Sequence, residues 1–230
     1  MKVDIWSDIR CPFCYIGKRK FEMALEGFPQ RQQIEVEWHS FELDPNLKTE
    51  HGKSVYDYLA ERKGMTREQS ETMHVQVTQM AAEVGLNYDF DSAVISNSFD
   101  AHRIIQLAKT KGLGDVSEEE FFKAYFCEGV DISNHASLLL IGQRIGLEEV
   151  DISRVLSSNE FADEVRYDEH QAQEIGVTGV PFFVLNNKYA VSGAQAPETF
   201  LHALEVAWSE ITPTNTQLND GASCDADGNC

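Results

Sequence analysis

Positive charge is scarce in this sequence. Its 230 residues include 19 lysines and arginines against 38 aspartates and glutamates, for a formal net charge of −19. A surface of this sign repels a phosphate backbone. We therefore expect no nucleic-acid partner, and we attribute the acidic excess to solubility.

Long apolar runs are also lacking. No stretch reaches the roughly 18 apolar residues that suggest a membrane helix. Near the N-terminus, Asp4, Ser7, Asp8 and Arg10 interrupt the apolar run that a secretory signal needs. We therefore expect no membrane partner and a cytoplasmic location.

Cysteine is too sparse for a disulfide-rich scaffold. A chain of this length with an odd number of cysteines does not fit such a framework. In a reducing compartment, cysteines are more often catalytic or metal-binding. The seven histidines show no paired ligand spacing, so we predict no metal site and no cofactor. The five cysteines are Cys11, Cys14, Cys127, Cys224 and Cys230.

The two ends of the chain carry strand patterns. Residues 2–6 and 33–43 alternate between apolar and polar side chains, and a helical pattern from Pro12 to about Glu26 separates them. Near the other end, two β-rich runs flank a turn at 186–188, and a helix follows. The order βαβ and then ββα predicts an α/β, thioredoxin-like fold with one mixed sheet.

Between these ends, the chain reads as helical throughout. Apolar residues recur at helical spacing across 53–175, which predicts a large all-helical insertion between the two ends of the sheet. We divide the chain into a discontinuous thioredoxin-like domain, a helical insertion domain and a flexible tail that carries two cysteines. Their ranges are 1–52 with 176–210, 53–175, and 211–230.

The Cys11-Pro12-Phe13-Cys14 segment carries the clearest chemical signal. Residues at i and i+3 share a helix face, so the two sulfurs can meet. The first lies at a helix N-terminus, where unpaired N–H groups favour a negatively charged thiolate, the nucleophilic form. A CxxC near a βαβ pattern is typical of redox proteins. We expect an exposed Cys11 to attack and a partly buried Cys14 to resolve.

Two other interpretations of this segment stay open. The pair could be half of a zinc site completed by Cys224 and Cys230, in a zinc-stabilised binding module. It could also be two inert core cysteines. A zinc ribbon places CxxC on tight turns rather than at the head of an apolar helix, which favours redox chemistry.

Pro181 gives a second signal, because proline at the start of a strand removes a ladder hydrogen-bond donor. A cis bond between Val180 and Pro181 would explain it and would leave the Val180 backbone free to pair with an extended substrate. The alternative is an ordinary edge proline. We place Pro181 in the catalytic site and assign substrate contacts to Pro12, Phe13 and Val180.

With these motifs, the sequence resembles the DsbA family of thioredoxin-fold oxidoreductases, in particular its FrnE-like branch. The resemblance implies a helical insertion, a cis proline at Pro181 and exchange at Cys11 and Cys14 with protein or small-molecule thiols and disulfides, glutathione among the candidates. The matching segments are Ser7-Asp8, Cys11 through Arg19, Ser98 through Arg103, Ala124 through Phe126, Gly129 through Ile132, Gly176 through Phe183 and Ser192 through Gln195.

A rival group shares the fold, namely kappa-class glutathione transferases and hydroxychromene-carboxylate isomerases. These proteins typically keep one Ser or Cys where this chain has a complete CxxC, so Cys14 argues against them. Cys224 and Cys230 resemble an extra cysteine pair of the FrnE-like branch and are candidates for an auxiliary redox pair. The alternative is an incidental pair in a polar tail.

Other polar residues near the motif have weaker signals. Asp8 and Arg10 flank Cys11 and would tune it in opposite directions. Cys127 follows an aromatic helix and reads as a small buried hydrophobe. His39 and His102 are expected in the core or on the surface rather than in the site.

Overall fold

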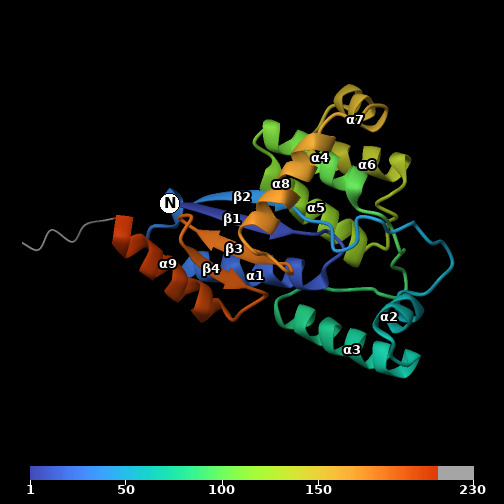
Figure 1. Cartoon of the computed structure of the whole chain (residues 1–230), viewed down its shortest axis with the longest axis horizontal. Coiled ribbons are helices and arrows are strands. Elements are labelled where there is room, and N and C mark those ends of the chain that lie inside the picture. The colour runs from blue at the N-terminus through green and yellow to red at the C-terminus, as the bar shows by residue number, and fades with distance from the viewer. Residues whose placement is uncertain (212–230) are drawn as a thin grey trace, which may run out of the picture.

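The computed structural model describes residues 1–211 and contains one four-stranded sheet (Figure 1). The strand order is β2-β1-β3-β4, with β1 and β2 parallel and β3 antiparallel to both β1 and β4. The two ends of the chain therefore build one mixed sheet, as expected. The strands are β1 (Lys2–Ser7), β2 (Glu35–Ser40), β3 (Phe182–Leu185) and β4 (Tyr189–Ser192).

Helices α1 (Pro12–Gly27) and α9 (Pro197–Ile211) pack on one face of the sheet. The contact is aromatic: the ring centroids of Phe21 and Phe183 lie 5.4 Å apart, and those of Phe183 and Phe200 lie 4.6 Å apart. Alternation along the strands supplies this face, since every second side chain points the same way. Burying this face fixes where α1, and the cysteines at its head, lie relative to the sheet.

All the longer helices between β2 and β3 belong to the segment predicted to be helical. Most of them gather beside β2, whereas α2 and α3 form a hairpin near the start of α1 (Figure 1). Their bounds are α2 (Val55–Lys63), α3 (Arg67–Glu83), α4 (Phe99–Thr110), α5 (Gly114–Phe126), α6 (His135–Ile145), α7 (Glu149–Leu156) and α8 (Ala162–Glu174). The α/β fold with a large helical insertion is confirmed.

The helical segment shares a hydrophobic core with helix α1 and the loop before it. Ile9, Cys14 and Ile16 pack in one cluster with Phe121 and Phe122 of α5. The division into domains therefore remains a prediction, because this cluster crosses the proposed boundary. The tail with Cys224 and Cys230 lies outside the described residues.

Some boundaries differ from the predicted ones. The second strand begins at Glu35 rather than at residue 33, because Arg31–Gln33 form a short 3-10 turn, and α9 extends to Ile211. Within residues 1–211, no helix is long and apolar enough to cross a membrane.

Candidate active site

The two cysteines of the motif lie at the N-terminus of α1. Cys11 is the N-cap residue and Pro12 occupies the first position, where the missing proline N–H is not needed. The N–H of Cys11 donates to the carbonyl of Asp8, and the N–H of Cys14 donates to the carbonyl of Cys11, both at 2.9 Å. Both cysteines are free thiols. The unpaired N–H groups of the first turn can therefore stabilise an anion at Cys11.

The loop before β3 lies over the first cysteine. The Val180–Pro181 bond is cis, as the sequence indicated, and the Cys11 thiol donates to the Val180 carbonyl at 3.4 Å. Our expectation of an exposed first sulfur was wrong: Cys11 is 4 % exposed and Cys14 is fully buried. Cys11 is still the more exposed of the two, as expected for the attacking cysteine, but the loop that covers it leaves only a small part of it accessible.

Gly17 permits α1 and the loop to approach each other. A Cβ atom built at this position would lie 2.9 Å from Cγ of Pro181, closer than real Cβ contacts allow. Only glycine fits without moving the proline. The structure thus brings Cys11, Cys14 and Pro181 to one place, although their catalytic roles remain predictions.

The three predicted substrate-binding residues differ in exposure. Phe13 is 39 % exposed, and Pro12 and Val180 are half-buried. An exposed aromatic ring between the two cysteines suits contact with a partner. Their role in substrate binding stays a prediction.

Cys14 is held as a neutral thiol by its surroundings. Burial raises its pKa well above the ordinary value, and the neighbouring Cys11 raises it further. The backbone of Asp8 and the hydroxyl of Ser7 oppose this shift in part. Cys14 must therefore lose a proton before it can attack, and the structure supplies polar groups close to it.

Asp8 is the buried carboxylate closest to the motif in sequence. One oxygen accepts from the N–H of Arg10 at 3.0 Å, and the other accepts from the N–H of Leu43 at 2.8 Å. Nε2 of His102 lies 3.6 Å from Asp8, an ion-pair distance longer than a hydrogen bond. Burial would raise the pKa of Asp8, but His102 and Arg10 outweigh it and lower the pKa. The carboxylate is thus charged and held in place.

Beyond Asp8, His102 faces a second buried carboxyl group, Glu118, which the sequence analysis did not single out. His102 is fully buried with no hydrogen-bond partner on either ring nitrogen, and Glu118 is 1 % exposed. Burial raises the pKa of Glu118 to about 7. Glu118 sits in an acidic run that looks solvent-exposed, but it lies three and four residues before Phe121 and Phe122, on the buried face of α5. This helical spacing from two buried aromatic residues could have predicted that Glu118 is buried.

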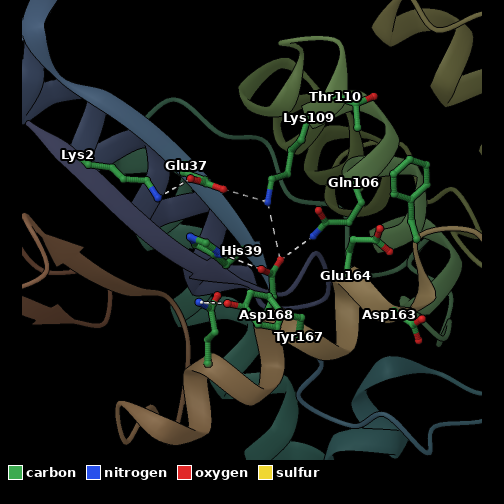
Figure 2. Close-up of a pocket in the computed structure, with 12 residues that line it drawn as sticks. Lys2, Glu37, His39, Gln106, Lys109, Thr110, Asp163, Glu164, Tyr167 and Asp168 are labelled. Carbon is green, nitrogen blue, oxygen red and sulfur yellow. Dashed lines mark hydrogen bonds and ion pairs between the residues drawn. The ribbon is translucent and has the colours of Figure 1, made fainter.

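A larger hollow of about 770 Å³ lies away from the cysteines, between the sheet and helices α4 and α8 (Figure 2). Its polar groups bond one another: His39 lies 2.9 Å from Asp168 and 2.8 Å from Asp4, and Lys2 pairs with Asp4 and Glu37. Asp4, Glu37 and His39 are close enough to share an ion, but Lys2 already supplies a positive charge there. This cluster joins α8 to the sheet.

The remaining cysteine candidates do not join the site. Cys127 is a half-buried free thiol at the end of α5, and burial raises its pKa. Cys224 and Cys230 lie outside the described residues, so the auxiliary pair stays a prediction.

Several solved structures share this architecture. A probable DsbA oxidoreductase from Streptomyces coelicolor is 39 % identical, with a TM-score of 0.88 over 100 % of this chain and 98 % of the other. A 2-hydroxychromene-2-carboxylate isomerase shares the fold at 17 % identity and a TM-score of 0.65, covering 92 % and 96 %. The cytosolic disulfide reductase DsbM from Pseudomonas aeruginosa, solved with GSH, shares it at 15 % identity and a TM-score of 0.63, covering 90 % and 99 %.

The family assignment rests on sequence as well as on structure. A family model described as the DSBA-like thioredoxin domain matches residues 2–205, nearly the whole described chain. The match spans both ends of the sheet and the helices between them. This chain therefore belongs to the DSBA-like thioredoxin domain family.

Proposed function

We propose that this protein is a thiol–disulfide oxidoreductase that exchanges disulfides through Cys11 and Cys14. The observation that carries the proposal is the placement of Cys11 at the N-cap of α1, with its sulfur 3.4 Å from the Val180 carbonyl beside Pro181. The unpaired N–H groups of the helix N-terminus can stabilise negative charge that develops on the sulfur, and the neighbouring loop offers backbone groups to an extended substrate.

The exchange proceeds in two balanced steps. The Cys11 thiolate attacks one sulfur of a substrate disulfide, which forms a mixed disulfide and releases the first substrate thiolate. Cys14 then gives up its proton and attacks the Cys11 sulfur, which forms the Cys11–Cys14 disulfide and releases the second substrate thiolate. Two electrons pass from the pair to the substrate, and the reverse sequence oxidises a substrate dithiol. The direction in the cell depends on the partner's reduction potential.

Two alternatives are less well supported. A glutathione-dependent isomerase or transferase shares the fold. That chemistry needs only the first position of the motif, so it would give the buried Cys14 no role. A zinc-stabilised module of the ribbon type places its CxxC on a tight turn, whereas Cys11 and Cys14 lie at the N-terminus of helix α1.

The finer assignments belong to the same proposal. Membership of the FrnE-like branch is supported by the motifs quoted above. Protein disulfides and small thiols such as glutathione are the proposed partners, and the likeness to a cytosolic reductase solved with GSH supports the thiol chemistry and a cytoplasmic location.

The experiment is stoichiometric oxidation of the reduced protein by hydroxyethyl disulfide, followed by peptide mapping. We expect a disulfide to form between Cys11 and Cys14. When dithiothreitol is supplied, we expect the protein to catalyse continuous reduction of hydroxyethyl disulfide. The Cys127→Ser variant is the matched control and should behave like the wild type. A protein whose Cys11 and Cys14 stay reduced would overturn the proposal.

A further inference from the structure

A small hollow of about 150 Å³ opens beside Pro12, next to the cysteine motif. Its walls are mainly apolar and aromatic, with Tyr58, Phe90 and Tyr125 among them, and Arg10 also lines it. The only other ionisable base in the lining is His74, whose pKa burial lowers, so Arg10 supplies the full positive charge. The hollow thus combines an apolar wall with one cation, which suits a small organic anion.

Within the described residues, the Arg10 guanidinium has no anionic partner at ion-pair distance. Its Nε is buried without a hydrogen-bond partner, and its guanidinium forms no ion pair with any carboxylate in residues 1–211. The other arginines of this part that are not exposed do have one: Arg19 pairs with Glu119, and Arg103 pairs with Asp100. A charge removed from water without a partner is costly, so this site favours a ligand that brings an anion.

Burial would lower the pKa of Arg10, but the charge of Asp8, two residues away, helps to raise it; the two side chains nevertheless form no ion pair. The oxygens of Asp8 are occupied by the N–H groups of Arg10 and Leu43, and His102 lies against it on the other side. These contacts fix the loop that presents Cys11. The side-chain charge of Arg10 is left available next to the hollow.

We propose that Arg10 binds the carboxylate of a small disulfide substrate while Cys11 attacks its sulfur. Arg10 and Pro12, the residues on either side of Cys11, both line the hollow, so a small molecule bound there lies next to Cys11. The guanidinium is a planar fork that matches a carboxylate, and it stays protonated throughout the exchange. This inference rests on the proposed function and names a substrate class for it.

The overall charge of the protein would not predict a preference for an anionic disulfide. With a net charge of −19, the protein as a whole attracts cations and repels anions. A local preference for an anionic substrate therefore has to come from a built site. Three aliphatic disulfides with the same spacer separate these effects: anionic dithiodipropionate, neutral hydroxyethyl disulfide and cationic cystamine.

The first test uses the wild-type protein alone. For each disulfide, kcat/KM with dithiothreitol as reductant is divided by the uncatalysed rate constant, which removes intrinsic reactivity. We expect dithiodipropionate to exceed cystamine by about tenfold, the range of one charge-assisted hydrogen bond. A preference for cystamine would overturn the inference, and so would equal values for the three disulfides.

The second test changes the charge. Arg10→Gln should lower the ratio of kcat/KM for dithiodipropionate to that for hydroxyethyl disulfide by about tenfold, and Arg10→Lys should keep part of it. Arg31→Gln removes the same charge from an exposed turn and should leave the ratio as in the wild type. A ratio that Arg10→Gln does not change would defeat the inference while hydroxyethyl disulfide turnover still supports the proposed function. No turnover of any disulfide by the wild type would defeat both.

Discussion

The sulfur of Cys11 lies 3.4 Å from the carbonyl oxygen of Val180, although 169 positions separate the two residues in the chain. This contact joins the head of α1 to the loop before β3. It covers the first cysteine and places the backbone of the loop beside the sulfur that we propose to be the nucleophile.

Gly17→Ala should disturb this arrangement directly. The new Cβ would lie 2.9 Å from Cγ of Pro181, so the loop must shift, and overpacking of this kind destabilises by about 1–3 kcal/mol. We expect a lower unfolding free energy in urea and slower disulfide exchange. Gly27→Ala is the matched control in the same helix, because its Cβ meets only Leu201 at 3.8 Å, and it should have neither effect.

Phe13→Ala should weaken substrate binding with little effect on the fold. The ring is 39 % exposed, so its loss should change stability by no more than about 0.5 kcal/mol. For a peptide disulfide that covers the ring, kcat/KM should fall on the order of tenfold, because an apolar contact is lost. Leu140→Ala, at a more exposed apolar position on α6, should not change kcat/KM. Equal kinetics for both variants would remove Phe13 from the binding site.

Glu118→Gln should change how stability depends on pH. Burial raises the pKa of Glu118 from the ordinary 4.5 to about 7. Its favourable contribution is complete below about 4.5 and is lost as pH rises to about 7, by at most about 1.4 kcal/mol per pH unit. The stability of the variant relative to the wild type should therefore increase between pH 5 and 7. Parallel stability curves in urea unfolding would contradict the assignment.

His39→Gln should be most destabilising at low pH. Burial alone would lower the pKa of His39, but hydrogen bonds with Asp168 and Asp4 outweigh it and raise the pKa above 6.5. The stabilisation is complete below about 6.5 and is lost as pH rises through the folded-state pKa. Breaking a buried pair costs about 3–5 kcal/mol. We expect that loss near pH 6 and a smaller one near pH 9, measured by urea unfolding; the reverse order would refute a charged His39.

The order of elements was predictable because it depends on local patterns. Alternation gave the strands, and helical spacing gave the insertion between them. Cys11, Cys14 and Pro181 were found because short motifs mark them. The burial of Glu118 and the approach of His102 to Asp8 were not predicted, since both depend on helices that meet only in the folded chain. The covering of Cys11 was predicted wrongly for the same reason, because the Val180 loop is remote in sequence.

The central claim is that Cys11 attacks and Cys14 resolves. The most direct measurement is mass spectrometry with peptide mapping of Cys14→Ser and Cys11→Ser after incubation with a peptide disulfide. The account predicts a stable mixed disulfide at Cys11 in Cys14→Ser, because Cys14 is no longer there to displace the substrate. It predicts no mixed disulfide at Cys14 in Cys11→Ser, because Cys14 is fully buried with a raised pKa. An adduct at Cys14 in Cys11→Ser, or full exchange activity in that variant, would contradict it.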